Sequence, residues 1–344
     1  MTLRAGIIGN GGYGKVHAAS ARQMPDITMT GYYDVVPERA AAYAEEFGGT
    51  AFENADALIE AVDVVILVTP PTHRVEYIRR IAEAGRSCLC QKPMALHPEE
   101  TAEICRIVEE SGITFGVGFN GRFTPLYMRM ADMLADGALG DLVYCWQTLH
   151  TDLPLATWER YRREGHWRTK QETSGGRVFE MGSHDIDYLI KLGQTPRRVH
   201  ATCAISHPTL DTDDTDLAVI EFRNGYAKWE LSKAPQSVQI NNAGIMGTEA
   251  MVATAPSGGL LLRRRGEKQT EKIEVDPTVS LPGVEGPAGI TEIRDRMFYD
   301  AVLNGTRFEA DCWAGKKAAD VCRAIIDSAR EHQTVSFPEG SFAG

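Results

Sequence analysis

The chain has 344 residues, 43% of them hydrophobic and 24% charged, which is enough to bury the cores of two domains. Its formal net charge of −11 opposes binding to the phosphates of nucleic acids, so we expect no nucleic-acid partner. No run approaches the ~20 apolar residues of a membrane-spanning helix and no secretory signal is visible, so we expect a cytoplasmic chain without membrane association. The seven cysteines contain no C-x-x-C pair, so we expect reduced thiols and no metal site.

The first 120 residues or so alternate short apolar runs with segments of helical period, which is the pattern of successive βαβ units. Five strands are expected, at Leu3–Ile8, Ile27–Tyr33, Val62–Val68, Ser87–Cys90 and Thr114–Phe119. Their nearly continuous apolar character fits a parallel sheet covered on both faces. We therefore expect a doubly wound α/β domain over residues 1–122.

The pattern changes after Asn120, where a helix at Tyr127–Leu134 leads into segments that resemble strands. These strands are expected at Leu142–Thr148, Val199–Ala204, Leu217–Phe222 and Ala227–Leu231, and helices at Glu292–Leu303 and Ala314–Ala329 follow. Short turn signals between neighbouring strands favour antiparallel pairing. Residues 123–344 are thus expected to form an α+β domain with a large, open, mostly antiparallel sheet.

A glycine-rich motif of the form G-x-G-x-x-G lies between the first strand and an expected helix at Lys15–Met24. It consists of Gly9, Asn10, Gly11, Gly12, Tyr13 and Gly14. Such glycines allow a tight turn and the close approach of a pyrophosphate, whereas a flexible turn is the alternative reading of the motif alone. Asp34 follows Gly14 by 20 residues at the end of the second strand, where a carboxylate binds the adenosine ribose. The combination predicts a Rossmann domain that prefers NAD. Arg39, five residues further on, is either a residue that softens this preference and leaves NADP possible or a solvated helix residue.

Two further polar segments follow the strands at 62–68 and 87–90, where ligands of a doubly wound sheet bind. They are Thr69-Pro70-Pro71-Thr72-His73 and Gln91-Lys92-Pro93. Together with the glycine motif and the segments 117–123, 174–176, 180–187 and 247–249, they resemble the Gfo/Idh/MocA oxidoreductase family, which includes inositol dehydrogenases and glucose–fructose oxidoreductase. The resemblance extends over essentially the whole chain.

The resemblance implies that Lys92 lies beside the nicotinamide and the substrate hydroxyl, although an ordinary surface lysine is the alternative. The glutamate that usually precedes this lysine in the family is replaced by Gln91, which keeps a hydrogen-bonding side chain near the nicotinamide ribose. Because the replacement removes an anion, we expect the pKa of Lys92 to be lower than in relatives.

Glu180 and His184 match an Asp-x-x-x-His pair of the family. If this stretch is helical, the two side chains share one face, so the carboxylate would orient and stabilise an imidazolium. His184 would then accept the proton of the substrate alcohol. A structural histidine, and a Glu180 that binds a substrate hydroxyl instead, are the alternatives.

The segment from Trp158 to Arg177 is expected to be loop-like, and its aromatic and cationic side chains suit a sugar ring or, alternatively, anchor a surface loop. By resemblance, cofactor contacts are assigned to Trp167, Arg168, Thr69, Pro70, Pro71, His73, Gln91, Lys92 and Asn120. Substrate contacts are assigned to Lys92, Arg122, Trp158, Glu180 and His184.

The sequence therefore predicts an NAD(P)-dependent oxidoreductase that transfers a hydride to or from a secondary alcohol or ketone carbon of a sugar, cyclitol or sugar derivative. By resemblance, a homodimer or homotetramer that pairs through the C-terminal sheet is expected. Three alternatives stay open: a carbonyl reductase that uses NADPH, a redox-driven lyase or epimerase with tightly bound NAD, and a non-catalytic regulator that senses a dinucleotide.

Overall fold

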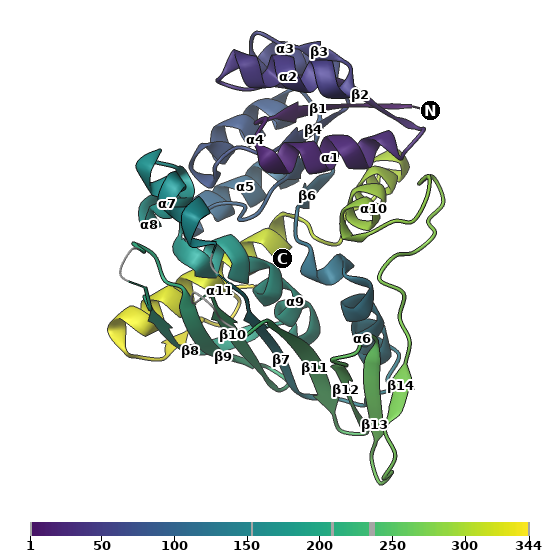
Figure 1. The fold of residues 1–344 in the computed structure, drawn as a ribbon, viewed down its shortest axis with the longest axis vertical. Helices are drawn as coiled ribbons and strands as arrows, with labels where there is room; N and C mark the ends of the chain where they lie inside the picture. The colour runs from purple at the N-terminus through teal and green to yellow at the C-terminus, as the bar shows by residue number, and fades with distance from the viewer. Residues whose placement is uncertain (1, 153, 208–209, 234–237, 343–344) are drawn as a thin grey trace. The chain divides into compact units, whose positions relative to one another are not determined.

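The computed structural model describes residues 2–152, 154–207, 210–233 and 238–342, whose path Figure 1 traces. The chain divides into two compact units, Met1–Phe123 with Thr278–Lys316, and Thr124–Pro277 with Lys317–Gly344. The domains expected from the sequence, residues 1–122 and 123–344, assign Thr278–Lys316 to the second domain, whereas the structure groups this segment with the first unit. Helix α10 (Ile290–Asn304) in this segment packs on α1 (Gly12–Arg22), and its Phe298 fills the space beside Gly116.

The described part of the first unit contains a six-stranded parallel sheet in the order β3-β2-β1-β4-β5-β6. The strands are β1 (Leu3–Ile8), β2 (Ile27–Tyr33), β3 (Thr50–Ala51), β4 (Val64–Leu67), β5 (Ser87–Cys90) and β6 (Phe115–Val117). The expected doubly wound sheet and its five strands are confirmed. Strand β3 escaped prediction because its two residues are exposed and carry no apolar pattern.

Helices cover both faces of this sheet, so all four residues of β4 are buried. Besides α1 and α10 they are α2 (Pro37–Phe47), α3 (Ala55–Ala61), α4 (Arg74–Glu83) and α5 (Pro98–Ser111). Proline at the first position starts α2 and α5, and the Asn54 side chain caps α3 by accepting from Ala57 N at 2.8 Å. The strand order reverses between β1 and β4, so the loops after these strands lie at the point where such sheets bind ligands.

The second unit contains, among its described residues, nine strands in the order β14-β13-β12-β11-β7-β10-β9-β8-β15. They are β7 (Leu142–His150), β8 (Pro196–Ala204), β9 (Thr215–Phe222), β10 (Tyr226–Ser232), β11 (Ile240–Gly247), β12 (Ala250–Thr254), β13 (Leu260–Arg264), β14 (Glu271–Ile273) and β15 (Val335–Ser336). Of the strand pairs in the described part of the chain, β7 and β10 are parallel and the others in this sheet are antiparallel, so the sheet is mixed and mostly antiparallel. The expected open α+β sheet is confirmed, with more strands than predicted.

Two helices of the second unit lie on one face of this sheet (Figure 1). Helix α9 (Ser183–Gly193) contacts β7 and β10, and α6 (Pro125–Ala135) contacts β11 and β12. Strand β10 shows the resulting alternation, because Ala227, Trp229 and Leu231 are buried while the residues between them are less so. A large core of buried apolar side chains results on that face.

The segment from Trp158 to Arg177 is helical over much of its length, so the expectation of a loop was wrong. It comprises most of α7 (Leu155–Arg163), a 3₁₀ turn at Trp167–Thr169 and α8 (Gln171–Ser174). These helices are short and mostly polar, which is why their period is hard to see in the sequence. Helix α11 (Cys312–Glu331) is the last helix among the described residues.

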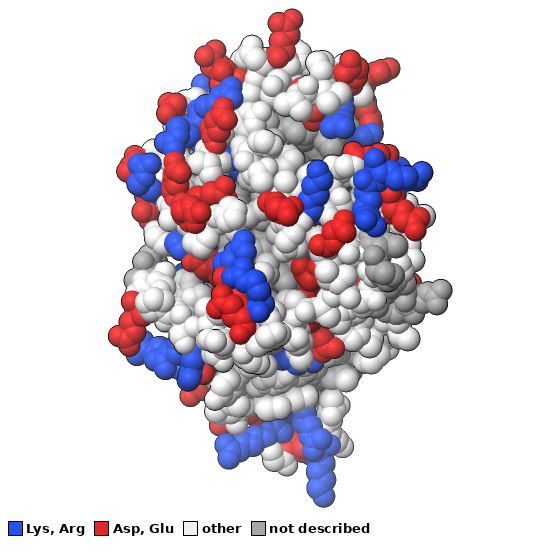
Figure 2. Space-filling model, turned by 90° about the vertical axis from the view of Figure 1, so that its left-hand side faces the viewer, with Lys and Arg blue, Asp and Glu red and all other residues white. Residues whose placement is uncertain are grey.

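None of the helices in the described ranges has the length and apolar character needed to cross a membrane. Within the same ranges the seven cysteines form no disulfide, and six of them are buried. Figure 2 shows acidic and basic side chains interspersed over one face.

Candidate functional site

The glycine loop after β1 has the geometry that a bound dinucleotide requires. Gly9 has a φ of 95°, and a Cβ added there would lie 2.9 Å from the backbone N of Thr69, so a side chain cannot be accommodated. A Cβ added at Gly14 would approach the Tyr43 hydroxyl to 3.0 Å. By contrast, nothing lies within 4 Å of a Cβ built on Gly11 or Gly12. The loop thus packs tightly at both ends and leaves open space at its centre.

Asp34 is 8% exposed and is held by two backbone donors. Its Oδ2 accepts from Asn10 N at 2.7 Å, and its Oδ1 accepts from Val36 N at 2.9 Å. The carboxylate therefore ties the end of β2 to the glycine loop, where a ribose would lie. Arg39 Nη1 lies 3.7 Å from Asp34 Oδ1, and the Arg39 side chain is 59% exposed.

Three polar side-chain atoms around this loop are buried and have no hydrogen-bond partner among the described residues: Asn10 Nδ2, Asn10 Oδ1 and Thr69 Oγ1. Buried polar groups are nearly always paired, so orphaned atoms at a strand-end loop indicate a ligand that satisfies them. The open centre at Gly11 and Gly12, the N-terminus of α1 and these atoms together fit a dinucleotide.

Lys92 is the one partly exposed residue between Cys88 and Leu96, all of whose other members are buried. Its neighbour Gln91 is 4% exposed and places Nε2 2.7 Å from His17 Nε2. A Cβ added at Gly118 would clash with the Gln91 amide at 2.6 Å, so glycine there makes room for this side chain. The Lys92–Pro93 peptide bond is cis.

Gln91 and its partner His17 belong to a hydrogen-bonded network within the first unit, whose charged side chains are fully buried. His17 Nδ1 lies 2.9 Å from Asp295 Oδ2, and Arg294 Nη2 donates to Asp295 Oδ1 at 2.8 Å. Arg294 Nη1 donates to Asn120 Oδ1 at 2.6 Å, and Asn120 Nδ2 donates to the Tyr13 hydroxyl at 3.2 Å. Burial opposes ionisation of Asp295, but Arg294 and His17 outweigh it and lower its pKa to about 2. The network thus links the glycine loop, Asn120 and the Lys92 loop.

Sequence reasoning missed Arg294 and Asp295, which are 0% exposed. Their partners lie far away in the sequence, and both residues stand in a helix with little apolar periodicity, so they resemble surface charges. No local signal distinguishes them.

In the second unit, Glu180 lies in a π-helix over Val178–Gly182 that leads into α9. Its Oε2 accepts from Arg177 Nη1 at 2.5 Å, and its Oε1 lies 3.5 Å from Arg168 Nε. The expectation that Glu180 and His184 share a face assumed a regular α-helix. The wider π turn, with i→i+5 bonds, changes that spacing, so the pairing of these two residues stays a prediction.

Arg177, which the sequence reasoning did not select, forms an ion pair with the Glu180 carboxylate. Its guanidinium lies 3.8 Å from the centre of the Trp158 ring, and Trp158 is 4% exposed and packs on Leu210. The Trp158 ring thus stacks against the Arg177 guanidinium in a cation–π contact. Arg168 lies over the Trp167 ring at 5.2 Å.

His184 is partly exposed, whereas Ser183 and Asp185 on either side are buried. Asp185 Oδ2 accepts from Trp229 Nε1 at 3.2 Å, and a Cβ added at Gly182 would lie 2.4 Å from the Trp229 ring. These contacts seat the start of α9 on the sheet of the second unit and leave the His184 imidazole at the surface of that helix.

The remaining predicted residues take several positions. Pro71–His73 form a 3₁₀ turn after β4 in which Pro71 is buried and His73 is exposed. Arg122 is 6% exposed, and its Nη1 donates to Glu309 O at 2.9 Å. Thus Arg122 holds backbone of the first unit, and a substrate contact for it stays a prediction.

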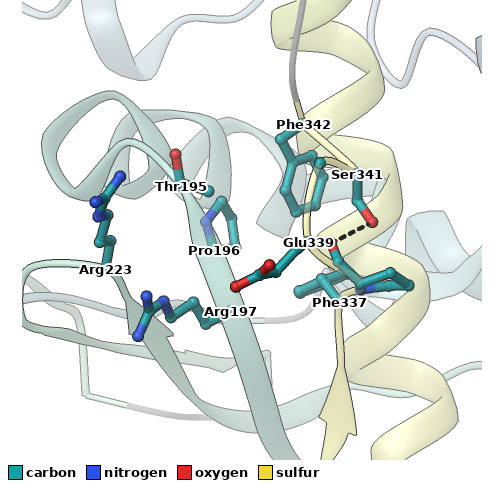
Figure 3. Close-up of a pocket in the computed structure, with 10 residues that line it drawn as sticks. Thr195, Pro196, Arg197, Arg223, Phe337, Glu339, Ser341 and Phe342 are labelled. Carbon is teal, nitrogen blue, oxygen red and sulfur yellow. Dashed lines mark hydrogen bonds between the residues drawn. The ribbon is translucent and has the colours of Figure 1, made fainter.

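A cavity of about 380 Å³ lies elsewhere in the second unit (Figure 3). It is lined by Thr195, Pro196, Arg197, Arg223 and the segment Phe337–Phe342. The residues around it include none of the predicted site residues, so the candidate site is defined by the loops above and not by this cavity.

Comparison with known proteins identifies the family. A model described as "Oxidoreductase family, NAD-binding Rossmann fold" matches residues 3–119, and a model of the GFO/IDH/MocA C-terminal domain matches residues 127–253. Together the two matches span more than half of the chain. This protein belongs to the Gfo/Idh/MocA family of NAD-binding oxidoreductases, as the sequence motifs indicated.

Individual relatives are more distant. Inositol 2-dehydrogenase from Rhizobium meliloti is 31% identical over 208 residues, which cover 60% of this chain and 59% of that protein. Glucose-6-phosphate 3-dehydrogenase from Bacillus subtilis is 26% identical over 188 residues, which cover 54% of this chain and 52% of that protein. The chain thus spans between half and two thirds of the length of these curated relatives.

A solved structure of levoglucosan dehydrogenase, in complex with NADH and levoglucosan, superimposes with a TM-score of 0.86 at 22% identity. The match covers 98% of this chain and all of that one. At this identity the likeness establishes the fold.

Proposed function

We propose that this chain transfers a hydride between NAD and a secondary alcohol or ketone carbon of a sugar, cyclitol or sugar derivative. The observation that carries the proposal is Lys92, a partly exposed lysine within a run of buried residues at the strand ends that cradle the dinucleotide. A cation held there is suited to bind the oxygen of a substrate whose carbon faces the nicotinamide.

The roles of the residues follow from their chemistry. When bound, the oxidised dinucleotide would supply a hydride acceptor for oxidation of the alcohol carbon, and the reduced dinucleotide would supply a hydride donor for reduction of the ketone. The Lys92 ammonium holds the substrate oxygen, and the His184 imidazole accepts the hydroxyl proton during oxidation and returns it during reduction. Glu180, fixed by Arg177 and Arg168, orients a substrate hydroxyl or the imidazole. By resemblance to the family, Trp167 and Arg168 are assigned to cofactor binding.

The substrate class is supported by what the relatives are named for: inositol, glucose 6-phosphate and levoglucosan. All three carry ring carbons with secondary hydroxyls. NAD is preferred over NADP because Asp34 lies, with little exposure, where a 2′-phosphate would be repelled, while exposed Arg39 leaves NADP possible.

We also propose that two copies of the chain pair through the open sheet. Several large apolar side chains are exposed on the face of the sheet opposite α9, among them Leu217, Val219, Tyr226 and Met246. Such a patch indicates an interface. Light scattering of the purified chain that gives the mass of a dimer or tetramer would support this pairing, and a monomer would exclude it. The cytoplasmic location stays a prediction.

The test of the activity is NADH formation, followed by absorbance, when the protein and NAD or NADP are offered inositols, aldoses, sugar acids and glycosides. We expect turnover with one class and a preference for NAD. Lys92→Ala should lower kcat by roughly 100-fold or more while NADH binds within a few-fold of the unaltered protein. The matched control is Lys272→Ala, which removes an exposed lysine of the second unit.

The alternatives give different results in the same assay. A redox-driven lyase or epimerase would purify with NAD bound and convert substrate without net NADH release. A dinucleotide sensor would bind NAD and turn over nothing. Activity of the Lys92→Ala variant within a few-fold of the unaltered protein would discard the role given to Lys92.

A further inference from the structure

Arg74 is a buried arginine beside the cofactor loops that the reaction described above does not use. It is the first residue of α4, directly after the 3₁₀ turn Pro71–His73, and it is 2% exposed. Arginine stays charged in proteins, and its guanidinium carries five N–H donors that need acceptors when water is excluded. The acceptors it has therefore show what the side chain holds.

The acceptors of Arg74 include backbone carbonyl oxygens from two separate loops. Its Nε and Nη2 donate to Thr69 O at 3.0 and 2.6 Å. Its Nη1 donates to both Gln91 O and Pro93 O. Thr69 follows β4 and Gln91 follows β5, so one planar group joins the ends of two neighbouring strands.

The two carbonyls bound by Nη1 belong to the residues immediately before and after Lys92. The Gln91 carbonyl belongs to the peptide group 91–92 and the Pro93 carbonyl to the peptide group 93–94, so Arg74 holds the chain on both sides of Lys92 and Pro93. Because peptide groups are planar and the proline ring fixes one further dihedral angle, this restrains the direction in which the Lys92 side chain leaves the backbone. A carbonyl at a strand end that loses its donor must find water or another partner, which requires the loop to move. Arg74 thus controls the one segment of this loop that contains a partly exposed side chain.

We propose that Arg74 is a positioning residue that fixes Lys92 relative to the Thr69 end of the nicotinamide pocket. The proposal rests on the proposed function insofar as Lys92 is the group that binds the substrate oxygen. Arg74 touches neither substrate nor cofactor in this scheme and acts through the backbone of residues 91–93.

The backbone of residues 91–93 and the side chain of Gln91 are held by different residues. The Gln91 side chain is bound to His17, a contact that orients this side chain but supplies no donor to the Pro93 carbonyl. Lysine at position 74 would keep the charge, but its single ammonium cannot reproduce the planar fork that reaches three carbonyls. Removal of the fork is therefore expected to loosen residues 91–96 while the β-sheet beneath them stays intact.

The experiment compares Arg74→Lys and Arg74→Met with Arg80→Met in the full-length protein. Arg80 is on the same helix, is 28% exposed in its side chain and pairs with Asp56 on α3, so its variant removes a cation of α4 without touching the loops. Two readouts are made on each folded variant: amide hydrogen exchange of peptides that span residues 69–73 and 91–96, and the steady-state kinetics with NAD and the substrate found above.

We expect faster exchange in both peptides for the two Arg74 variants and not for Arg80→Met. We expect kcat to fall by roughly 10- to 100-fold, because small misplacements of a catalytic group have effects of this size, while the KM for NAD changes by about 3-fold or less. Arg74→Lys should recover neither the exchange rate nor kcat. If Arg74→Met does not fold, Arg74→Lys carries the test.

Unchanged exchange in residues 91–96 of a folded Arg74 variant would overturn the proposal, as would a kcat within 2-fold of the unaltered protein. A global rise in exchange, with equal loss for Arg80→Met, would show a general role in stability and would also overturn it. If exchange rises locally but the unaltered protein turns over no substrate, the loop is held as proposed and the proposed function fails instead.

Discussion

The polar groups around Lys92 and those around Glu180 differ in how far they are removed from water. In the first unit, His17, Arg294 and Asp295 are 0% exposed and satisfy one another. In the second unit, the side chains of Glu180 and Arg168 are 15% and 36% exposed, whereas Arg177, the nearest partner of Glu180, is nearly as buried as the first network, at 5%. The first arrangement holds a cofactor loop in place, and the second leaves charged groups available to a ligand.

The difference teaches which substitutions affect folding and which affect activity. Removing one member of a buried charged network leaves the other charges without partners in a region of low dielectric, which is strongly destabilising. Removing a partly exposed partner lets water replace it, so the loss of stability is small. We therefore expect substitutions in the buried network to lower the free energy of unfolding strongly and substitutions around Glu180 to lower it little.

The largest effect is expected for Asp295→Ala. It leaves Arg294 and His17 buried without their carboxylate and should lower the free energy of unfolding at pH 7 by about 3–5 kcal/mol, measured by urea denaturation. Because the pKa of Asp295 is lowered to about 2 in the folded state, its contribution is complete above pH ~4 and is lost as the pH falls towards 2. The difference between variant and unaltered protein should therefore shrink over that range.

The control for this prediction is Asp63→Asn. Asp63 pairs with Arg4 at 2.6 Å, but these side chains are 31% and 50% exposed. Its substitution should cost about 1 kcal/mol or less. Equal losses for the two variants would mean that burial does not govern these pairs.

An intermediate effect of the opposite sign is expected for Asp216→Asn in the second unit. Burial and the nearby Asp213 carboxylate raise the pKa of Asp216 to about 9, so the folded chain keeps a proton that the unfolded chain releases near pH 4. Stability therefore falls as the pH rises from about 4 to about 9. An asparagine does not ionise, so the variant should be more stable than the unaltered protein at pH 8 and almost equal to it in stability at pH 4.

This prediction is checked by urea unfolding at several pH values. The exposed Asp211→Asn variant is the control, because a side chain with 59% exposure should not alter the pH profile. A gain for Asp216→Asn that is the same at pH 4 and pH 8 would rule out ionisation as its cause.

The smallest effect on stability is expected for Glu180→Gln, which keeps an acceptor for Arg177. We expect a loss of about 1 kcal/mol or less in unfolding free energy, together with a fall in kcat of roughly 10-fold or more if the carboxylate orients substrate or His184. Thermal unfolding and NADH formation on the same sample measure the two effects. A loss of stability as large as that of Asp295→Ala would place Glu180 with the buried networks and remove the contrast between the regions.

Much of the fold could be read from the sequence where the residues of an element are alike. Strands such as Leu3–Ile8 and Ile27–Tyr33 are mostly apolar, interrupted by Arg4 in the first and by two threonines in the second, so their place in a parallel sheet was predictable. Strand β11 was not, because Asn241, Asn242 and Gly244 have low strand propensity, and the pairing with β7 that stabilises it is distant in the sequence.

The candidate site divides in the same way. Asp34 and the glycine loop were found because their spacing along the chain is fixed by a single βαβ unit. Arg74, Arg177 and Asp295 were missed because each is a charged residue on a helix, and only its packing distinguishes it from a surface charge. The π turn at Val178–Gly182 carries no recognised sequence signal, so the spacing of Glu180 and His184 was assigned on the wrong helix period.

The late segment that completes the first unit bears on how the protein is made. During synthesis the ribosome must produce 316 of the 344 residues before Thr278–Lys316 can join the unit that begins with β1. Until then His17 lacks Asp295, and Gly116 lacks the phenyl ring of Phe298. The nascent N-terminal unit therefore lacks part of its core through most of translation and can complete its packing only when the chain is nearly finished.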